Sequence, residues 1–220
     1  MYVVLAPEAL DRPEAYPEWC SLGWFRNYRH LTGDVETHYH DLPEVYLWHE
    51  GTAAAVIAGQ AVAMRPGLVA YTAAGDHHSY AVAGRHSNTG LAPKAFPGCR
   101  SGHLHTQTTG ESPRPSVPSF WVAPEENPFA APRELPRYCF ARHIACARFT
   151  TAQAVLQRAA TSWLALLVRE GGIRVQADGQ TLEVPENHLF IAAPGTRLCV
   201  AALSAAEVAL AEGWPTEIPG

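Results

Sequence analysis

The sequence is poor in charged residues and has no cluster of basic ones. Charged residues make up 17% of its 220 residues, and 21 Asp and Glu outnumber 16 Lys and Arg, so the formal net charge is -5. Proteins that bind nucleic acid need basic side chains to contact the phosphate backbone. The composition therefore argues against a nucleic-acid partner and favours a small-molecule substrate.

Long apolar runs and targeting segments are also lacking. Apolar stretches such as residues 52–58 are much shorter than the roughly 18 residues that a membrane-spanning helix needs. The N-terminal stretch MYVVLAPEALDRPE has neither the basic start nor the sustained apolar run of a secretory signal. We therefore expect no membrane partner and a cytoplasmic location.

Cysteine is scarce and forms no CxxC pair, whereas histidine is concentrated. The five cysteines are scattered, which is typical of reduced thiols rather than of a disulfide framework or a zinc knuckle. Nine of the eleven histidines lie between His30 and His105. This concentration indicates that the chemistry lies in the N-terminal part of the chain.

The sequence resembles itself at a distance of 120 residues. This shift places Gly51 on Gly171 and Gly75 on Gly195, although two unrelated β segments that share turn glycines are an alternative. Each copy consists of short runs rich in β-branched and aromatic residues, separated by Gly, Pro or Asp turns, as expected for strands. The pattern predicts an all-β protein with two small antiparallel barrels or sandwiches.

Residues 84–137 differ in composition from both copies. They hold nine of the 18 prolines, so we expect a long irregular connection that its aromatic residues hold against the barrels. The predicted domains are 1–83 for the first barrel, 84–137 for the connecting and covering segment, and 138–220 for the second barrel. Residues 150–161 are ambiguous, because their composition favours a helix whereas the repeat aligns their end with a strand.

His38, His40 and Glu44 form a tight group in the first copy. Residues two apart on a strand point to the same side, so both imidazoles face one point, and a short bend at residues 41–43 lets Glu44 rejoin them. Another ligand comes from His77 or His78, only one of which can reach that side. Imidazoles together with a carboxylate make a facial metal site. A lone histidine would more often be a hydrogen-bonded core residue.

This group resembles the motifs of the cupins. The first cupin motif is a glycine, an HxH pair, a glutamate and a second glycine, and the sequence from Gly33 to Gly51 follows it with one residue fewer before the HxH pair. The second motif matches at Gly67, Gly75 and His78, although Ala73 replaces a proline and Val82 replaces an asparagine.

The resemblance and the repeat together indicate a bicupin. They imply two double-stranded β-helix (jelly-roll) barrels joined by the proline-rich connection, with one divalent metal ion held by His38, His40, Glu44 and His78. In the second copy the same positions are Arg158, Ala160, Leu164 and Leu198. The second barrel is therefore expected to lack a metal and to pack against the first.

Strand alternation predicts the lining of a pocket beside these ligands. Tyr46 and Trp48 share the side of Glu44, and Tyr80 shares the side of His78. Tyr46 and Tyr80 are candidate catalytic acid–base residues, although large aromatic side chains equally often only fill a barrel. The remaining pocket candidates are Arg26, Tyr28, Trp48, His103 and His105.

Arg26 bears on the substrate. An inward Arg26 predicts a carboxylate or phosphate substrate, whereas an outward one indicates a solvated edge. His103 and His105 are predicted to lie in a loop that covers the pocket. The other histidines of this half, His30, His49, His77 and His86, are predicted to lie at the surface or behind the ligands.

The ligand set permits several chemistries. Fe(II), the favoured ion, leaves positions for substrate and dioxygen, whereas a non-redox ion supports isomerase, epimerase or lyase chemistry. Zn, Mn, Ni and Cu also suit these ligands. We expect a metal-dependent enzyme of the dioxygenase type that acts on a small polar organic substrate, as a monomer or homodimer. The sequence is also compatible with a non-catalytic binding protein and with a purely structural barrel.

Overall fold

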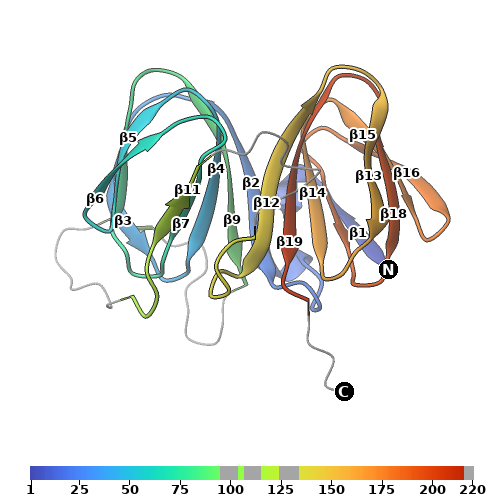
Figure 1. The fold of residues 1–220 in the computed structure, drawn as a ribbon, viewed down its shortest axis with the longest axis horizontal. Coiled ribbons are helices and arrows are strands. Elements are labelled where there is room, and N and C mark those ends of the chain that lie inside the picture. Colours follow the sequence, from blue (N-terminus) through green and yellow to red (C-terminus); the bar gives the residue numbers. More distant parts are fainter. Residues whose placement is uncertain (95–103, 107–114, 124–133, 216–220) are drawn as a thin grey trace. The chain divides into compact units, whose positions relative to one another are not determined.

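The computed structural model describes residues 1–94, 104–106, 115–123 and 134–215, which form 19 β-strands and two short 3-10 helices (Figure 1). The chain divides into two compact units. The N-terminal barrel is Leu22–Pro124, and the C-terminal barrel combines Met1–Ser21 with Glu125–Gly220. None of the helices in the described ranges is long and apolar enough to cross a membrane. The predicted all-β fold is confirmed.

The N-terminal barrel consists of two antiparallel sheets, with the strand orders β10-β3-β8-β5-β6 and β11-β7-β4-β9-β2. Side chains that alternate along the facing strands, such as Trp48, Ile57 and Met64, fill the space between the sheets. The strands are β2 (Leu22–Leu31), β3 (Val35–His40), β4 (Glu44–Glu50), β5 (Ala53–Ile57), β6 (Gln60–Met64), β7 (Val69–Thr72), β8 (His78–Val82), β9 (His86–Pro93), β10 (Leu104–Thr106) and β11 (Phe120–Val122).

The C-terminal barrel has the sheet orders β1-β17-β14-β19-β12 and β13-β18-β15-β16. Its interior is more apolar and includes Leu166, Phe190 and Leu210, all buried. The strands are β1 (Tyr2–Leu5), β12 (Ala141–Phe149), β13 (Gln153–Ala159), β14 (Leu164–Glu170), β15 (Gly172–Ala177), β16 (Gln180–Pro185), β17 (Leu189–Ala192), β18 (Arg197–Ala202) and β19 (Ala206–Gly213).

The two barrels repeat the same strands at a distance of 120 residues. Strands β4, β7 and β9 begin and end 120 residues before β14, β17 and β19. Gly51 and Gly171 both have φ +74°, and a Cβ on either would lie 2.3 Å from a backbone oxygen. This left-handed conformation and close approach explain why both copies need glycine there. The structure thus supports a true repeat over unrelated segments that share turn glycines.

Residues 150–161 contain a strand and no helix. Strand β13 pairs antiparallel with β18 along its length. Its composition is helical, but the barrel needs a strand at this position, and tertiary pairing overrides a weak local preference. The repeat predicted this segment better than its composition did.

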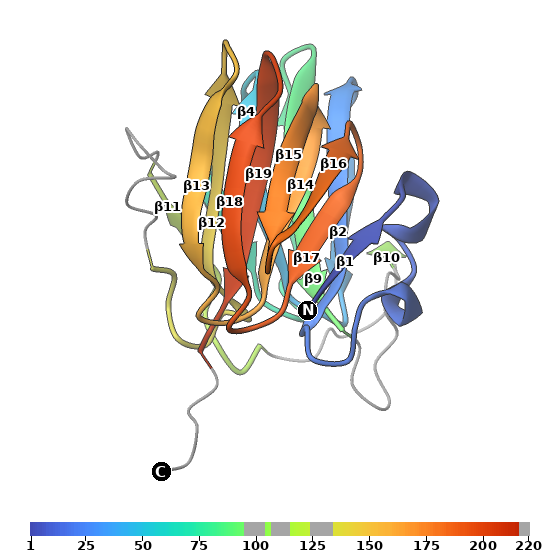
Figure 2. The same cartoon turned by 90° about the vertical axis from the view of Figure 1, so that its right-hand side faces the viewer.

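Four strands lie outside the ranges in which the sequence placed barrel strands: β1, and β9, β10 and β11 within the predicted irregular connection. Strand β9, at the start of the predicted irregular connection, pairs with both β2 and β4. Strand β1, placed with the first barrel from the sequence, pairs with β17 at the edge of a sheet in the C-terminal barrel (Figure 2). Of the aromatic residues expected to hold the connection, Phe120 stacks on Tyr71 with ring centroids 5.0 Å apart.

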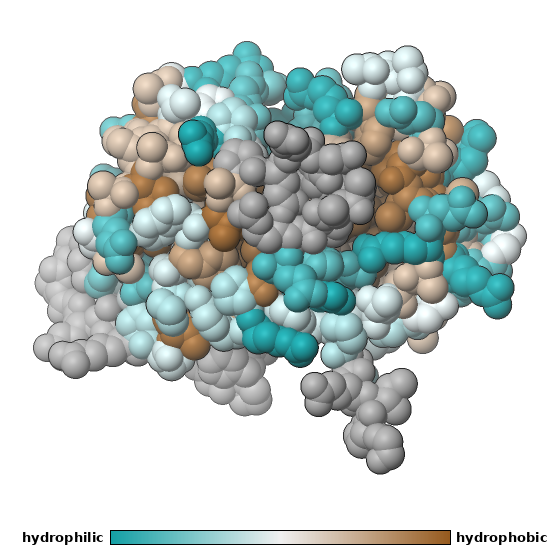
Figure 3. All heavy atoms as spheres, in the orientation of Figure 1, coloured by the Kyte–Doolittle hydropathy of each residue, from teal (hydrophilic) through white to brown (hydrophobic). Residues whose placement is uncertain are grey.

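Exposed and buried residues alternate along the strands, so every second side chain contributes to the outer surface. Along β15, the exposed Arg174 and Gln176 alternate with the buried Ile173 and Val175. Hydrophilic and hydrophobic residues are accordingly interspersed over the face shown in Figure 3.

Candidate metal centre

Three strands of the N-terminal barrel bring His38, His40, Glu44 and His78 together. The two histidines of β3 are separated by one residue and so share a face, and His38 lies opposite His78 on the neighbouring strand β8. A bend at residues 41–43 separates β3 from β4, which begins with Glu44. All four side chains are buried. His77, the alternative to His78, instead packs edge-on against Tyr39, with ring centroids 5.2 Å apart.

The distances between these side chains suit a single ion. One nitrogen from each of His38, His40 and His78 lies within 4.8 Å of the others. Glu44 Oε2 is 3.1 Å from His40 Nε2 and 4.0 Å from His78 Nε2. The Nε2 atom of His78 is buried and has no hydrogen-bond partner in the described part of the chain, which is costly unless a further group occupies the centre of the cluster. The residues present therefore fit a metal ion.

Backbone hydrogen bonds orient two of the imidazoles. The Nδ1 atom of His38 lies 2.7 Å from the carbonyl oxygen of Glu36, and that of His78 lies 3.1 Å from the carbonyl oxygen of Asp76. An Nδ1–H group that donates to a carbonyl leaves Nε2 without a proton and with its lone pair toward the cluster. This is the tautomer that binds metal.

The environment also keeps the cluster in its ligand form. Burial lowers the pKa of His38, and burial together with the neighbouring His38 lowers the pKa of His78 to about 4. Burial by itself would raise the pKa of Glu44, but the neighbouring imidazole of His40 brings it below its usual value. At neutral pH, His38 and His78 are therefore neutral and the carboxyl group is ionised, as metal binding requires.

Several solved structures resemble the whole chain. The chain resembles bacterial pirin YhhW from Escherichia coli in complex with nickel(II), with a TM-score of 0.63 and 12% identity over 98% of this chain and 100% of that one. It also resembles quercetin 2,3-dioxygenase from Acinetobacter baumannii (TM-score 0.58, 11% identity, 97% and 80% coverage). A third similar structure is procruciferin, an 11S globulin from Brassica napus (0.58, 10%, 92% and 79%). The chain has the two-barrelled cupin fold.

These similarities show the fold alone. No family model matches the sequence, and no curated protein matches it. A nickel-bound pirin, a dioxygenase and a globulin share the cupin architecture, and fold does not determine function. The function of this chain therefore depends on the residues of its own site.

The N-terminal cupin barrel contains a pocket of about 160 Å³ beside the histidine cluster. As predicted from strand alternation, His38, Tyr46, Trp48 and Tyr80 line it, and Tyr28 does so from β2. The hydroxyl of Tyr46 donates a short hydrogen bond to Glu44 Oε2. Burial raises the pKa of Tyr46 and of Tyr80. Both hydroxyl groups therefore keep their protons at neutral pH.

Arg26, a pocket candidate from the sequence, does not line this pocket, and its position matches the outward alternative. Its side chain is exposed and lies over the rings of Trp24 and Tyr28, at 5.9 and 6.0 Å from their centroids. Alternation gives the side of a residue, but β2 is the edge strand of its sheet. A long side chain on an edge strand can turn outward over its neighbours.

The prediction for His103 lies outside the described residues. His105 is in β10 and is the register partner of Tyr39, while its neighbours Leu104 and Thr106 are opposite His40 and His38. Two residues on β9 line the pocket but were not predicted from the sequence to do so. His86, expected at the surface or behind the ligands, is 3% exposed and lines the pocket with Asn88. Their spacing of two residues on one strand was the available signal.

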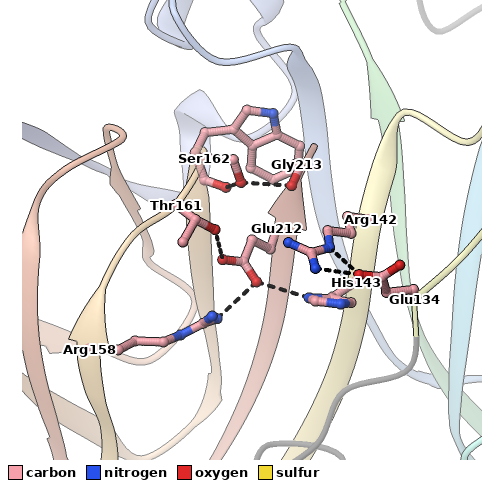
Figure 4. Close-up of polar contacts among 9 residues, drawn as sticks. Glu134, Arg142, His143, Arg158, Thr161, Ser162, Glu212 and Gly213 are labelled. Carbon is pink, nitrogen blue, oxygen red and sulfur yellow. Dashed lines mark hydrogen bonds and ion pairs between the residues drawn. The ribbon is translucent and has the colours of Figure 1, made fainter. Parts of the chain in front are cut away.

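The equivalent positions of the C-terminal barrel have a different environment. Ala160, Leu164 and Leu198 belong to its apolar core. Arg158 instead forms a hydrogen bond to Glu212, which is fully buried on β19 and also contacts His143 and Thr161 (Figure 4). An ion pair network therefore occupies the end of this barrel that corresponds to the histidine cluster.

Proposed function

We propose that this cupin is a mononuclear metal-dependent oxygenase, with one divalent ion held by His38, His40, Glu44 and His78. The observation that carries the proposal is the buried cluster of these residues, with two imidazoles held in the metal-binding tautomer, beside a pocket for a small organic molecule. The similarity to a dioxygenase and to a nickel-bound pirin supports it. Fe(II) is the favoured ion, because this donor set leaves positions for both substrate and dioxygen.

The chain's own residues provide the binding and proton chemistry around that ion. Trp48 and Tyr80 have rings stacked at a centroid distance of 6.0 Å and form an aromatic wall for the substrate. Tyr46 holds its proton on the oxygen that contacts Glu44, so it fixes the carboxylate and can act as a proton donor. The hydroxyl of Tyr80 is buried without a partner among the described residues and can bond to a substrate.

One observation favours a second candidate, a non-redox isomerase or lyase. The protonated phenol of Tyr46 lies next to a proposed ligand, where it can move a proton to or from a substrate polarised by Zn or Mn. The choice between these two functions depends on which ion binds and on whether turnover needs dioxygen.

Metal analysis tests the shared core of both functions. Protein purified without an affinity tag is analysed for bound metals, and the wild type is compared with His40→Ala and with His188→Ala as a matched control in the C-terminal barrel. We expect about one ion per chain in the wild type and in His188→Ala, and a loss of more than tenfold in His40→Ala. Metal retained by His40→Ala at the wild-type level would refute the assigned site.

Oxygen uptake then separates the two functions. The iron-loaded protein is screened against small aromatic and heteroaromatic substrates in an oxygen electrode, with anaerobic incubation as the control. Oxygen consumption linked to product formation supports the oxygenase. Product formed equally well without oxygen, with zinc or manganese bound, supports the isomerase or lyase instead.

A further inference from the structure

The pocket beside the histidine cluster contains buried polar atoms that have no hydrogen-bond partner among the described residues. They are the Tyr80 hydroxyl, Nδ1 of His86 and Oδ1 of Asn88. Leaving a buried donor or acceptor unpaired is energetically costly for each group. Three such groups around one cavity indicate that the cavity is shaped for a polar guest.

The fold holds two of these groups rigidly. His86 and Asn88 are two residues apart on β9, so they face the same side. The ring of His86 stacks on Trp48 with centroids 4.9 Å apart and an interplanar angle of 7°. A hydrogen bond to the backbone of Leu31 holds the same ring, and burial lowers its pKa. A neutral imidazole and an amide are thus fixed at this end of the pocket.

This polar end lies away from the proposed metal ligands. Asn88 is the register partner of Trp48 on β4. Trp48 is four residues along the strand from Glu44, or about 13 Å at the usual rise of a β-strand. A molecule that reaches both ends therefore needs polar groups on opposite edges.

The size and walls of the pocket limit the guest to one flat ring. The cavity volume is about 160 Å³, close to the ~150 Å³ of an engineered cavity that binds benzene. Aromatic side chains of Tyr46, Trp48 and Tyr80 line it, and aromatic rings pack well against each other. A single six-membered ring with small substituents fills such a space.

The described residues that line the pocket carry no formal charge at neutral pH. They include no Lys, Arg, Asp or Glu, and burial lowers the pKa of His38 and of His86, so both imidazoles are neutral. Arg26, the cation that a carboxylate would require, is exposed and lies outside the lining. Burying an unpaired anion here would be costly.

We infer that the pocket is a subsite for a single uncharged ring whose hydrogen-bonding groups, on the edge far from Glu44, are recognised by His86 and Asn88. The inference rests on the proposed function, because this ring is then the substrate that the metal centre acts on. His86 and Asn88 are specificity-determining residues, and rings with a carboxylate on that edge are rejected.

Ligand binding to the metal-free protein tests this inference. Benzamide, benzoate and toluene are titrated by NMR into the wild type, Asn88→Leu and His86→Phe, which keeps a ring on Trp48. Ser79→Ala is the control, because Ser79 lies opposite the exposed Val56 on the outer face of β8. We expect benzamide to bind at least tenfold more tightly than benzoate to the wild type. Each pocket variant should lose about tenfold for benzamide and little for toluene.

Three outcomes would overturn the inference. They are no benzamide binding to the wild type, equal affinities for benzamide and benzoate, or unchanged benzamide affinity in both folded pocket variants. Thermal unfolding of each variant verifies that it is folded. Metal content, measured separately, keeps the two proposals apart: a chain that binds benzamide but no metal refutes only the proposed function. A chain that binds metal but not benzamide refutes only this subsite.

Discussion

The guanidinium group of Arg158 donates a hydrogen bond of 2.9 Å to the carboxylate of Glu212 inside the C-terminal barrel (Figure 4). Glu212 is 0% exposed and also lies 3.0 Å from Nδ1 of His143. In the 120-residue register, Arg158 occupies the position of His38. The N-terminal barrel has imidazole side chains at this position. The C-terminal barrel instead has polar contacts that link β12, β13 and β19 through His143, Arg158 and Glu212.

We predict that Glu212→Leu destabilises the C-terminal barrel by about 3 kcal/mol, because it leaves the charge of Arg158 partly buried without a counterion. The double variant Arg158→Met/Glu212→Leu should recover most of this loss, since a well-packed apolar pair can replace a buried ion pair. Urea unfolding measures both. Arg174→Ala, which breaks the exposed pair with Glu183, should cost below about 1 kcal/mol. A double variant as unstable as Glu212→Leu would contradict the explanation.

Acid should destabilise the metal-free N-terminal barrel. Burial holds the pKa of His78 at about 4 in the folded protein, against 6.5 for the free side chain. Between these pH values the unfolded chain binds a proton that the folded chain does not, so stability falls as pH drops from 6.5 to 4. His78 accounts for about 3 kcal/mol of this fall.

Urea unfolding at a series of pH values, on chelator-treated protein, measures this dependence. His78→Gln removes the titrating group, and its stability should change less steeply with pH over the same interval. Equal slopes for the wild type and His78→Gln would show that the imidazole is not buried as described.

Tyr46→Phe should weaken metal binding about tenfold without abolishing it, because the lost hydroxyl orients a proposed ligand rather than binding the ion itself. Competition with a chelator measures the affinity. Tyr28→Phe removes another pocket hydroxyl, which accepts a hydrogen bond from Arg26, and it should leave the metal affinity unchanged. The prediction fails if both variants bind metal like the wild type.

Replacing either Gly51 or Gly171 by alanine should destabilise its barrel by more than about 2 kcal/mol. The left-handed backbone conformation alone costs an alanine about 1–2 kcal/mol, and the added Cβ would also clash with a backbone oxygen. Gly59→Ala is the matched control, since Gly59 has φ +75° but no atom within 4 Å of the added Cβ. It should lose only about 1–2 kcal/mol. Thermal unfolding of the three variants compares them directly.

The sequence predicted the histidine cluster because its geometry is local. Alternation along β3 places His38 and His40 on one face, and a short bend brings Glu44 back. The repeat could be recognised from glycines such as Gly51 and Gly171, because their left-handed backbone conformation strongly disfavours other residues. These features depend on a few neighbouring residues or on a single backbone angle.

The features that the sequence did not predict depend on distant neighbours. Strand β9 consists of small and polar residues such as Ser87, Thr89 and Gly90, and it is a strand because β2 and β4 flank it. The polar end of the pocket was missed for the same reason. The direction of Arg26 stayed open from the sequence because alternation does not show where a sheet ends.

Strand β1 pairs with a strand almost two hundred positions further along the chain, since Tyr2 lies opposite Ala192 on β17. The N-terminal barrel is thus an insertion within the C-terminal one. During synthesis, Leu22–Pro124 can fold as soon as it leaves the ribosome. Strand β1 of the C-terminal barrel can pair only after β17 has been synthesised. The barrel with the histidine cluster is therefore able to fold first, and removing residues from either end of the chain should destabilise the C-terminal barrel.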